Sequence, residues 1–292
     1  MTRPGADPDA SADGLVWLPA PAKLNLFLHV IGRRADGYHL LQTVFQLLDW
    51  GDRIGLAVTD DGAIQRSGGC PDLPAGQDLA VRAALALQRE SGVRSGARIH
   101  IDKHIPVGAG LGGGSSDAAT VLVGLDHLWR TGLAVERLAQ IGARLGADVP
   151  VFVHGHSAFA EGVGEKLTPV SLPGADFVVV WPGLPVATAD IFQAPELTRN
   201  TPASTISALL QTAAGNDLQP VAVRRHPEIG QALAFLCQHG PARMSGSGSA
   251  VFVPVADAAT AQAIVADSPW PAWAVRGVNR SPLQQLLAGD GR

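Results

Sequence analysis

Alternation between apolar and other side chains marks the strands of this chain. In residues 22–30, leucine and valine alternate with polar and aromatic residues, so a period of two places Lys23 and Asn25 on one face of a strand. Two prolines separate this strand from a shorter one at residues 14–17. Further strands are predicted at residues 40–49, 52–58, 97–103, 175–181 and 272–278, and on both sides of a Gly/Ser loop at residues 245–249.

Apolar residues at steps of three and four predict the helices. One helix is expected directly after a glycine-rich loop, with Ala118, Leu122 and Leu125 on one face. The next helix is expected to end at Gly146, because glycine favours the position after a helix. Asp78 is a candidate N-cap of an earlier helix. The further helices are predicted at residues 78–90, 205–214, 227–239 and 258–266.

The order of these elements indicates the fold class. Strands and helices alternate too irregularly for a doubly wound parallel sheet, so an α+β protein in two halves is expected. Residues 60–77 are rich in turn residues and are expected to form a loop. We expect a flexible tail at residues 1–13, an N-terminal domain at 14–155 and a C-terminal domain at 156–292.

The composition is that of a globular protein and argues against some classes of binding partner. Of the 292 residues, 46% are hydrophobic and 16% charged. A net charge of -4 offers no basic surface for nucleic acid or membrane, and no apolar run approaches the roughly 18 residues of a membrane helix. The two cysteines, Cys70 and Cys237, exclude a disulfide framework and favour a reducing, cytoplasmic location.

A glycine-rich loop at residues 105–119 is the main candidate for a binding site. It carries five glycines between positions 108 and 114 and leads into a helix that begins near Ser115, Ser116 and Asp117. Glycines let the backbone approach a ligand, and the first N–H groups of a helix have no internal partner, so the loop is a candidate phosphate site. A simple tight turn is the alternative.

Two nucleotide-binding motifs fit this loop poorly. It lacks the Gly-Lys-Ser/Thr ending of a P-loop, which excludes that class of ATPase. Gly108, Gly110 and Gly113 satisfy the dinucleotide pattern Gly-x-Gly-x-x-Gly. However, Pro106 separates them from the preceding strand, and no acid follows at the end of a strand about 20 residues on.

Three other groups of polar residues are candidates for a site. Tyr38 and His39 follow an Asp-Gly turn, where the alternative for Tyr38 is a packed core aromatic. Asp148 lies just past a predicted helix end and before an apolar run, where an acid serves either a local turn or a reaction. Lys23 lies either on a solvated strand face or in a site.

Taken in order, several stretches resemble a known superfamily. Pro-Ala-Lys-Leu-Asn-Leu at 21–26, the glycine loop and Ser-Gly-Ser-Gly-Ser at 245–249 resemble the galactokinase, homoserine kinase, mevalonate kinase and phosphomevalonate kinase superfamily. Arg-Ala-Asp-Gly-Tyr-His-Leu-Leu-Gln-Thr at 34–43, Leu-Gly-Ala-Asp-Val-Pro-Val-Phe at 145–152 and Phe-Ala-Glu-Gly-Val-Gly-Glu at 159–165 resemble, more narrowly, the 4-diphosphocytidyl-2-C-methyl-D-erythritol kinase family. The resemblance runs from about Leu18 to Leu283.

This resemblance implies a fold and a reaction. The fold would join an N-terminal ATP domain of the ribosomal-S5-domain-2-like type to a ferredoxin-like C-terminal domain that binds the substrate, with the active site in the cleft between them. The family transfers the γ-phosphoryl group of ATP, with Mg²⁺, to the tertiary C2 hydroxyl of 4-diphosphocytidyl-2-C-methyl-D-erythritol. This step belongs to the non-mevalonate route to isoprenoid precursors.

The resemblance also implies roles for the ATP-side residues. Asp148 matches the family's catalytic acid, and Lys23 matches its catalytic lysine, close enough to hold Asp148 ionised. Lys103 matches a residue near the adenine. Asp78 stands where the family often has Asn; the Asp side chain keeps the hydrogen-bond acceptor of an Asn but lacks its donor. Ser115 or Ser116 would reach Mg²⁺ or a phosphate oxygen. The loop residues that would hold the phosphates are Pro106, Val107, Gly108, Ala109, Gly110, Leu111, Gly112, Gly113, Gly114, Ser115 and Ser116.

On the substrate side, the resemblance implies a base-binding group. Tyr38 would stack on the cytosine, His39 would hydrogen-bond to it, and Phe192 would close its other side. Asn25 matches a contact to the methylerythritol hydroxyls. In the third loop, Ser247 and Gly248 would support the glycine loop and the substrate diphosphate.

Three other functions remain open at this point. A kinase for another alcohol such as mevalonate is possible, although Tyr38, His39 and Phe192 argue against it because mevalonate has no base to stack. A nucleotide-binding oxidoreductase built on the glycine loop and a non-enzymatic binding protein are the others. We expect small-molecule partners only, no nucleic acid or membrane, and a monomer or weak homodimer.

Overall fold

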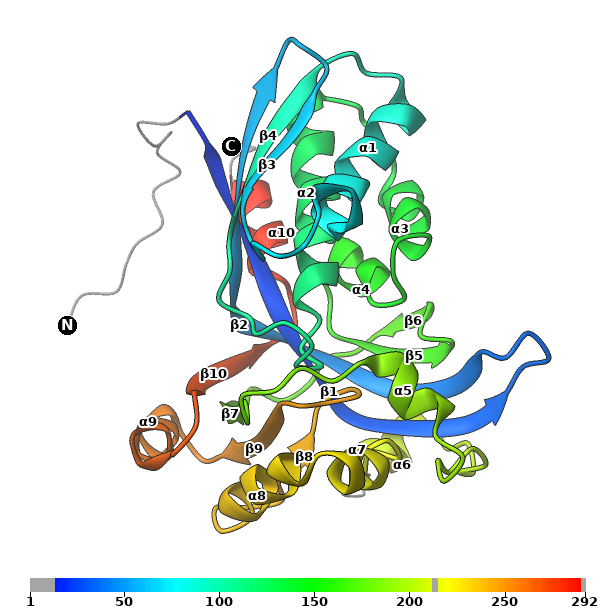
Figure 1. Ribbon diagram of the computed structural model, residues 1–292, viewed down its shortest axis with the longest axis vertical. Helices are drawn as coiled ribbons and strands as arrows, with labels where there is room; N and C mark the ends of the chain where they lie inside the picture. The colour runs from blue at the N-terminus through cyan, green and yellow to red at the C-terminus, as the bar shows by residue number, and fades with distance from the viewer. Residues whose placement is uncertain (1–13, 212–214, 290–292) are drawn as a thin grey trace.

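The computed structural model describes residues 14–211 and 215–289, so the expected tail at 1–13 lies outside the described residues (Figure 1). The first elements are β1 (Val16–Arg33), β2 (His39–Thr59), β3 (Ile64–Gly68), the 3₁₀ turn Ala75–Gln77, α1 (Leu79–Ser91), β4 (Gly96–Asp102), α2 (Gly113–Trp129), α3 (Val135–Ala143), α4 (Val149–His154), β5 (Ala158–Gly162) and β6 (Lys166–Pro169). The later elements are β7 (Asp176–Val180), α5 (Thr188–Gln193), α6 (Ile206–Gln211), α7 (Gln219–Arg225), α8 (Pro227–Leu236), β8 (Arg243–Met244), β9 (Val251–Val255), α9 (Ala258–Asp267), β10 (Ala272–Val278) and α10 (Pro282–Gly289).

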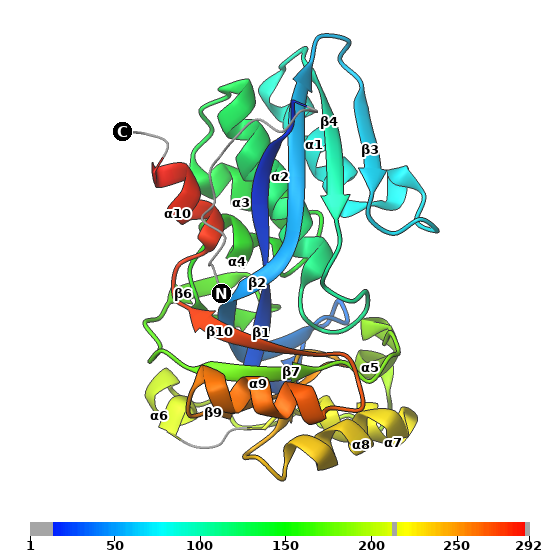
Figure 2. The same cartoon turned by 90° about the vertical axis from the view of Figure 1, so that its left-hand side faces the viewer.

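Two long antiparallel strands, β1 and β2, run through the length of the molecule (Figure 2). They pair from Val16 opposite Leu56 to Arg33 opposite His39. The other strands join them in one sheet, in the order β3-β4-β2-β10-β7-β9-β8, with β1 and β5 also paired to β2 and β6 paired to β5. The α+β class and the division into two parts are therefore confirmed.

Several predicted boundaries are wrong for identifiable reasons. The prolines at 19 and 21 do not end a strand but lie inside β1. The named strand that pairs with β1 is β2, so a missing N–H on the opposite edge of β1 removes no hydrogen bond from the sheet. Likewise, residues 40–49 and 52–58 form one strand, β2. The expected loop at 60–77 contains β3, a largely exposed edge strand that pairs in parallel with β4. The sequence of β3 is mostly polar and shows no alternation of apolar and polar residues.

The helices differ from expectation mainly at their ends. Helix α3 stops at Ala143 and not at Gly146. The helix expected at 205–214 is α6, Ile206–Gln211, and residues 212–214 lie outside the described part. The short helices α4, α5, α7 and α10 were not predicted, because one or two turns carry too few apolar positions to show a period.

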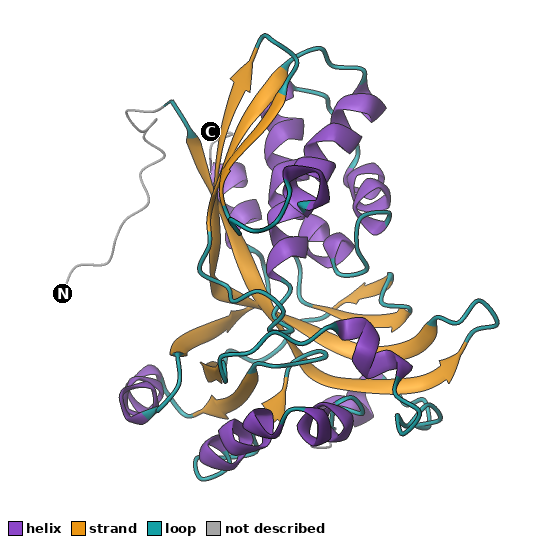
Figure 3. Cartoon of the chain, in the orientation of Figure 1, coloured by secondary structure: helices purple, strands orange, loops and turns teal. Residues whose placement is uncertain are grey.

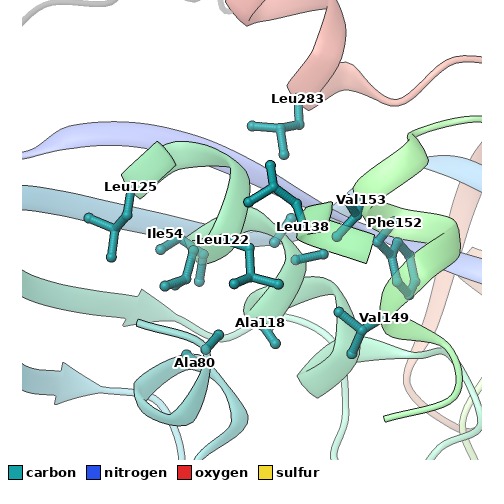
Figure 4. Packing of buried hydrophobic residues seen from close by; sticks show 14 of the residues in the cluster. Ile54, Ala80, Ala118, Leu122, Leu125, Leu138, Val149, Phe152, Val153 and Leu283 are labelled. Carbon is teal, nitrogen blue, oxygen red and sulfur yellow. The ribbon is translucent and has the colours of Figure 1, made fainter. Parts of the chain in front are cut away.

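Helices lie against the sheet in both halves of the molecule (Figure 3). The buried side chains between them form two main cores. In the first, α1 to α4 cover one face of the sheet around Leu122, Leu138 and Ile54 (Figure 4). In the second, α7 to α9 pack on β7 and β9. The last helix, α10, inserts Leu283 into the first core, and β10 pairs with β2, so the two halves share elements. The boundary between residues 155 and 156 stays a prediction.

Candidate active site

A cavity of about 870 Å³ lies where β1, the start of β2, the glycine loop, α5 and the Ser245–Ser249 loop meet. It brings together nearly all of the residues that the sequence singles out. Of these, Ser116 and Gly248 do not line it. The predicted residues that do are Lys23, Asn25, Tyr38, His39, Asp78, Lys103, Pro106, Val107, Gly108, Ala109, Gly110, Leu111, Gly112, Gly113, Gly114, Ser115, Asp148, Phe192 and Ser247.

The glycine loop ends in a helix start without a side-chain cap. Gly108, Gly110 and Gly112 have φ values of 68°, 74° and 76°, a region that side chains with a Cβ rarely adopt. Gly112 is the N-cap of α2, so Ser115, Ser116 and Asp117 lie inside the first turns and do not cap the helix as the sequence suggested. The first N–H groups of α2 therefore remain available to an anion.

The two serines of the loop have different surroundings. Ser115 lines the cavity, whereas the side chain of Ser116 is fully buried and its Oγ has no hydrogen-bond partner among the described residues. The sequence left open which serine reaches a ligand; the geometry favours Ser115.

Long-range hydrogen bonds hold the glycine loop in place. The carbonyl oxygen of Gly110 accepts from Lys23 Nζ and from Ser245 Oγ, both at 2.9 Å. Ser245 Oγ in turn accepts from the backbone N–H of Asn25 at 3.1 Å. A Cβ on Gly110 would overlap the carbonyl oxygen of Ser245. Ser245 was not among the predicted site residues, although its Gly/Ser loop was.

Gly248 and Ser247 serve the third loop in different ways. The N–H of Gly248 donates to Ser245 O at 2.9 Å, and a Cβ there would meet Met244 Sδ at 2.8 Å, so Gly248 shapes the loop and does not face the cavity. Ser247 Oγ lies 2.8 Å from Thr188 Oγ1 and thereby joins the loop to α5.

Lys23 and Asp148 form an ion pair in the wall of the cavity. Lys23 is only 3% exposed, and its Nζ lies 3.4 Å from Asp148 Oδ2 and 2.5 Å from Asn25 Oδ1. The Asn25 amide also donates to Thr43 Oγ1 at 2.9 Å, which fixes its orientation. Asp148 is 32% exposed and directly precedes α4, so it lies at a helix start as well as after α3, a position the sequence did not reveal.

Lys103 belongs to a buried charge cluster with Asp52 and Asp117. Its Nζ donates to Asp52 Oδ2 at 2.5 Å and to Asp117 Oδ2 at 2.7 Å. Asp52 Oδ1 also accepts from the N–H groups of His104 and Ile105, at 2.6 and 2.7 Å, and so fixes the entry to the glycine loop. Burial lowers the pKa of Lys103, but the two carboxylates outweigh it and raise that pKa overall.

The acids of this cluster were missed as site residues. Burial raises the pKa of Asp117 to about 8, and its Oδ1 has no hydrogen-bond partner among the described residues. The sequence feature that could have pointed to the cluster is an acid at position 52, between the two apolar segments that form β2.

Asp78 is the N-cap of α1, as predicted. Its Oδ1 accepts from Ala80 N at 2.9 Å, and its Oδ2 lies 2.8 Å from Arg66 Nη1. Both carboxylate oxygens are therefore engaged by the protein at the edge of the cavity.

An aromatic group closes the far end of the cavity. The rings of His39 and Phe192 have centroids 5.1 Å apart at an interplanar angle of 34°, while Tyr38 is 63% exposed. Arg199 Nε donates to His39 Nε2 at 3.1 Å. Burial, then the charges of Arg199 and Arg33, lower the pKa of His39. Arg199 was missed because its polar connector gave no indication of what it contacts.

Comparison with known proteins identifies the family. The model of the GHMP kinases N terminal domain matches residues 78–156, and that of the GHMP kinases C terminal matches residues 195–267. A 4-diphosphocytidyl-2-C-methyl-D-erythritol kinase from Aromatoleum aromaticum is 54% identical over 268 residues, which cover 91% of this chain and 94% of the relative. The chain belongs to the 4-diphosphocytidyl-2-C-methyl-D-erythritol kinase family.

Further comparisons agree with this family. A relative of the same description from Halorhodospira halophila is 54% identical over 282 residues, 95% of this chain and 98% of its own. The crystal structure of a 4-(cytidine 5'-diphospho)-2C-methyl-D-erythritol kinase matches with a TM-score of 0.76 at 36% identity, over 90% of this chain and 99% of that one. The mevalonate kinase of Methanococcus jannaschii matches with a TM-score of 0.64 at 15% identity, over 91% of this chain and 98% of its own, which shows the shared fold.

Membership of the 4-diphosphocytidyl-2-C-methyl-D-erythritol kinase family decides between the open alternatives at the level of class. The chain is a phosphotransferase with the two-domain GHMP kinase fold, and ATP is the phosphoryl donor of such kinases. The kinase is favoured over the oxidoreductase. Within the described ranges, no helix is long and apolar enough to cross a bilayer.

Proposed function

We propose that this chain transfers the γ-phosphoryl group of ATP to the tertiary C2 hydroxyl of 4-diphosphocytidyl-2-C-methyl-D-erythritol, a step in non-mevalonate isoprenoid precursor biosynthesis. One observation carries the proposal. The Lys23–Asp148 pair, the phosphate-type glycine loop and the His39–Phe192 aromatic pair all line one cavity. That arrangement suits a substrate with a reacting hydroxyl at one end and a base at the other.

Asp148 is the proton acceptor in this proposal. Its carboxylate is partly exposed to the cavity, and its Oδ2 lies 3.4 Å from Lys23 Nζ. As the new phosphorus–oxygen bond forms, the bond from the γ-phosphorus to the β,γ-bridging oxygen breaks and ADP leaves; the hydroxyl proton passes to Asp148 late in the reaction. Lys23, with Asn25 and Gly110 as further acceptors for its N–H groups, stabilises the negative charge that develops on the attacking oxygen.

Positioning accounts for most of the remaining catalysis. The uncapped N-terminus of α2 and the N–H groups of the glycine loop point positive dipole ends toward the phosphates. This stabilises the β- and γ-phosphate charges and holds the γ-phosphoryl group in line with the hydroxyl.

The oxygen ligands in the cavity suit Mg²⁺. Mg²⁺ typically binds one or two protein carboxylates together with phosphates and water, so it needs no protein cage, and no group of three His, Cys, Asp or Glu occurs in the described part of the chain. The hydroxyl of Ser115 would hold it beside the glycine loop. Bound there, Mg²⁺ would neutralise phosphate charge.

The other end of the cavity would hold the cytosine. Tyr38 would stack on one face and Phe192 on the other, with His39 at the edge of the base. Asn25 would contact the methylerythritol hydroxyls with the amide hydrogen and the lone pair that Thr43 and Lys23 leave free. A cytoplasmic location and a monomer or weak homodimer stay predictions.

A coupled ADP-release assay tests the function. It uses ATP, Mg²⁺ and 4-diphosphocytidyl-2-C-methyl-D-erythritol, with Asp148→Asn and Lys23→Ala beside the wild type. Loss of the proton acceptor or of the positive charge should lower turnover by about 10²- to 10⁴-fold. The exposed residues Asp60 and Lys166 supply matched controls, since Asp60→Asn and Lys166→Ala should retain full turnover.

The outcomes separate the alternatives. Turnover of another alcohol such as mevalonate, but not of this substrate, would keep the kinase class and overturn the base-binding group. No ADP release with any alcohol would overturn the catalytic proposal altogether.

A further inference from the structure

Arg199 is held rigidly against the base-binding end of the cavity. Its guanidinium donates to four backbone carbonyls around the end of α5, from Phe192, Ala194, Leu197 and Pro195, at 3.1, 2.6, 3.0 and 3.5 Å. Its remaining N–H, on Nε, donates to His39 Nε2 at 3.1 Å. With so many N–H groups engaged, the guanidinium has little freedom to turn.

This contact fixes which nitrogen of His39 carries the proton. A guanidinium has five donors and no acceptor, so the ring nitrogen that faces it must offer a lone pair. In a neutral imidazole, the other nitrogen then bears the hydrogen. His39 therefore presents Nδ1–H, and the one side-chain hydrogen bond of its ring among the described residues is that of Nε2.

The ring stays neutral in this setting. Partial burial lowers the pKa of His39, and the positive charges of Arg199 and Arg33 lower it further. A protonated ring would in addition place an N–H against the Arg199 N–H, which has no acceptor to offer.

We propose that Arg199 is a positioning residue that sets the base specificity of the enzyme, because it makes His39 a fixed hydrogen-bond donor at Nδ1. Such a donor suits N3 of cytosine, which is an acceptor, and opposes N3–H of uracil, which is a donor. The inference rests on the proposed function, since it assumes that a pyrimidine occupies the space beside His39 and Phe192.

The position of the proton is measured first, without substrate or turnover. The full-length chain is labelled with ¹⁵N-histidine, and His39→Gln identifies the His39 resonances among those of the nine histidines. The expected result is a neutral ring with the hydrogen on Nδ1, and a shift toward the Nε2–H form in Arg199→Gln. A hydrogen on Nε2 in the wild type would overturn the inference.

Base selectivity is measured next by calorimetric titration with cytidine diphosphate and uridine diphosphate. A donor facing a donor costs about 1–3 kcal/mol, so the wild type should prefer the cytidine compound by about 5- to 150-fold. In Arg199→Gln this ratio should fall to within about threefold, mainly because the uridine compound gains affinity. Affinity for ATP, which binds at the other end, should stay unchanged.

Two further variants guard against a merely structural effect. Arg225 Nη1 also donates to an α5 carbonyl, that of Asp190, at 2.9 Å, but does not contact His39, so Arg225→Gln should keep the wild-type ratio. Arg199→Lys tests the requirement for the planar guanidinium in case Arg199→Gln folds poorly; it should also lose selectivity.

Each remaining outcome is decisive. Equal weakening of both diphosphates in the Arg199 variants, or equal affinity of the wild type for both, would overturn the specificity role and leave the kinase function intact. If the wild type bound neither diphosphate, the base-binding part of the proposed function would be overturned, and the specificity role with it. The position of the proton on His39 would still report the effect of Arg199 on the ring.

Discussion

A single methyl group at Gly110 should disable the enzyme, because this residue has no room for a Cβ. In Gly110→Ala the Cβ would overlap Ser245 O and lie 3.0 Å from Gly248 O and 3.1 Å from Gly248 N, which are all backbone atoms of the third loop. The residue must also keep a φ of 74°, which costs an alanine about 1–2 kcal/mol. The two loops would therefore separate by about 1 Å, and a misplacement of that size costs about 10²-fold in rate.

The displacement reaches the reacting groups directly, because Gly110 O accepts from Lys23 Nζ. We expect Gly110→Ala to lower kcat by about 10²-fold in the coupled ADP-release assay, with a lower melting temperature. Gly76→Ala, outside the cavity, is the matched control: its Cβ would meet no atom within 4 Å, at an ordinary φ, so kcat should change less than about twofold. If Gly110→Ala retained kcat within threefold of the wild type, the reasoning about the joined loops would be refuted.

Two predictions concern stability. Because folding raises the pKa of Asp117 from about 4 to about 8, its protonated form favours the folded state, and that stability is lost as pH rises from about 4 to about 8. Urea unfolding from pH 5 to 9 should therefore show a fall in the unfolding free energy that levels off above pH 8 and that Asp117→Asn lacks. A profile of equal slope in both proteins would contradict this. Asp78→Ala removes the cap of α1 and the partner of Arg66, so it should lower the unfolding free energy by about 1–2 kcal/mol, whereas Asp78→Asn should cost less and leave the KM for ATP unchanged. An equal loss in both Asp78 variants would show that the cap contributes little.

The parts of the site that were predictable from sequence are those carried by local motifs. Residue types alone pointed to a phosphate site at the glycine loop, whereas Lys23 and Asp148 were singled out by the short motifs that resemble the kinase family. The structure brings all three into one cavity. Asp52 and Arg199 act only through partners far along the chain: Asp52 meets Lys103 51 positions away, and Arg199 meets His39 160 positions away. The local sequence shows neither partner: the acid at position 52 marks an unusual place in β2, but not what it contacts.

The fold was predictable to a similar extent. The apolar spacing of α2 and the continuous apolar run of β7 identify these elements from the sequence. Strand β3 was missed because an exposed edge strand needs no apolar face, and the continuity of β1 was missed because its prolines lie on an unpaired edge. In both cases the neighbouring strand, and not the local sequence, decides the structure.

The continuity of β1 and β2 has a mechanical consequence for turnover. Hinged enzymes close over their substrates through a few backbone positions whose φ and ψ change freely. Here the two halves share the β1–β2 ladder from Val16–Leu56 to Arg33–His39, which is interrupted by register shifts between Pro21 and Lys23, Asn25 and Leu28, and Val30 and Gly32. A change of φ and ψ within a paired segment would break ladder hydrogen bonds, so bending of one half against the other is expected at these interruptions. Two of them flank Lys23 and Asn25, so any such bending would move the reacting groups themselves.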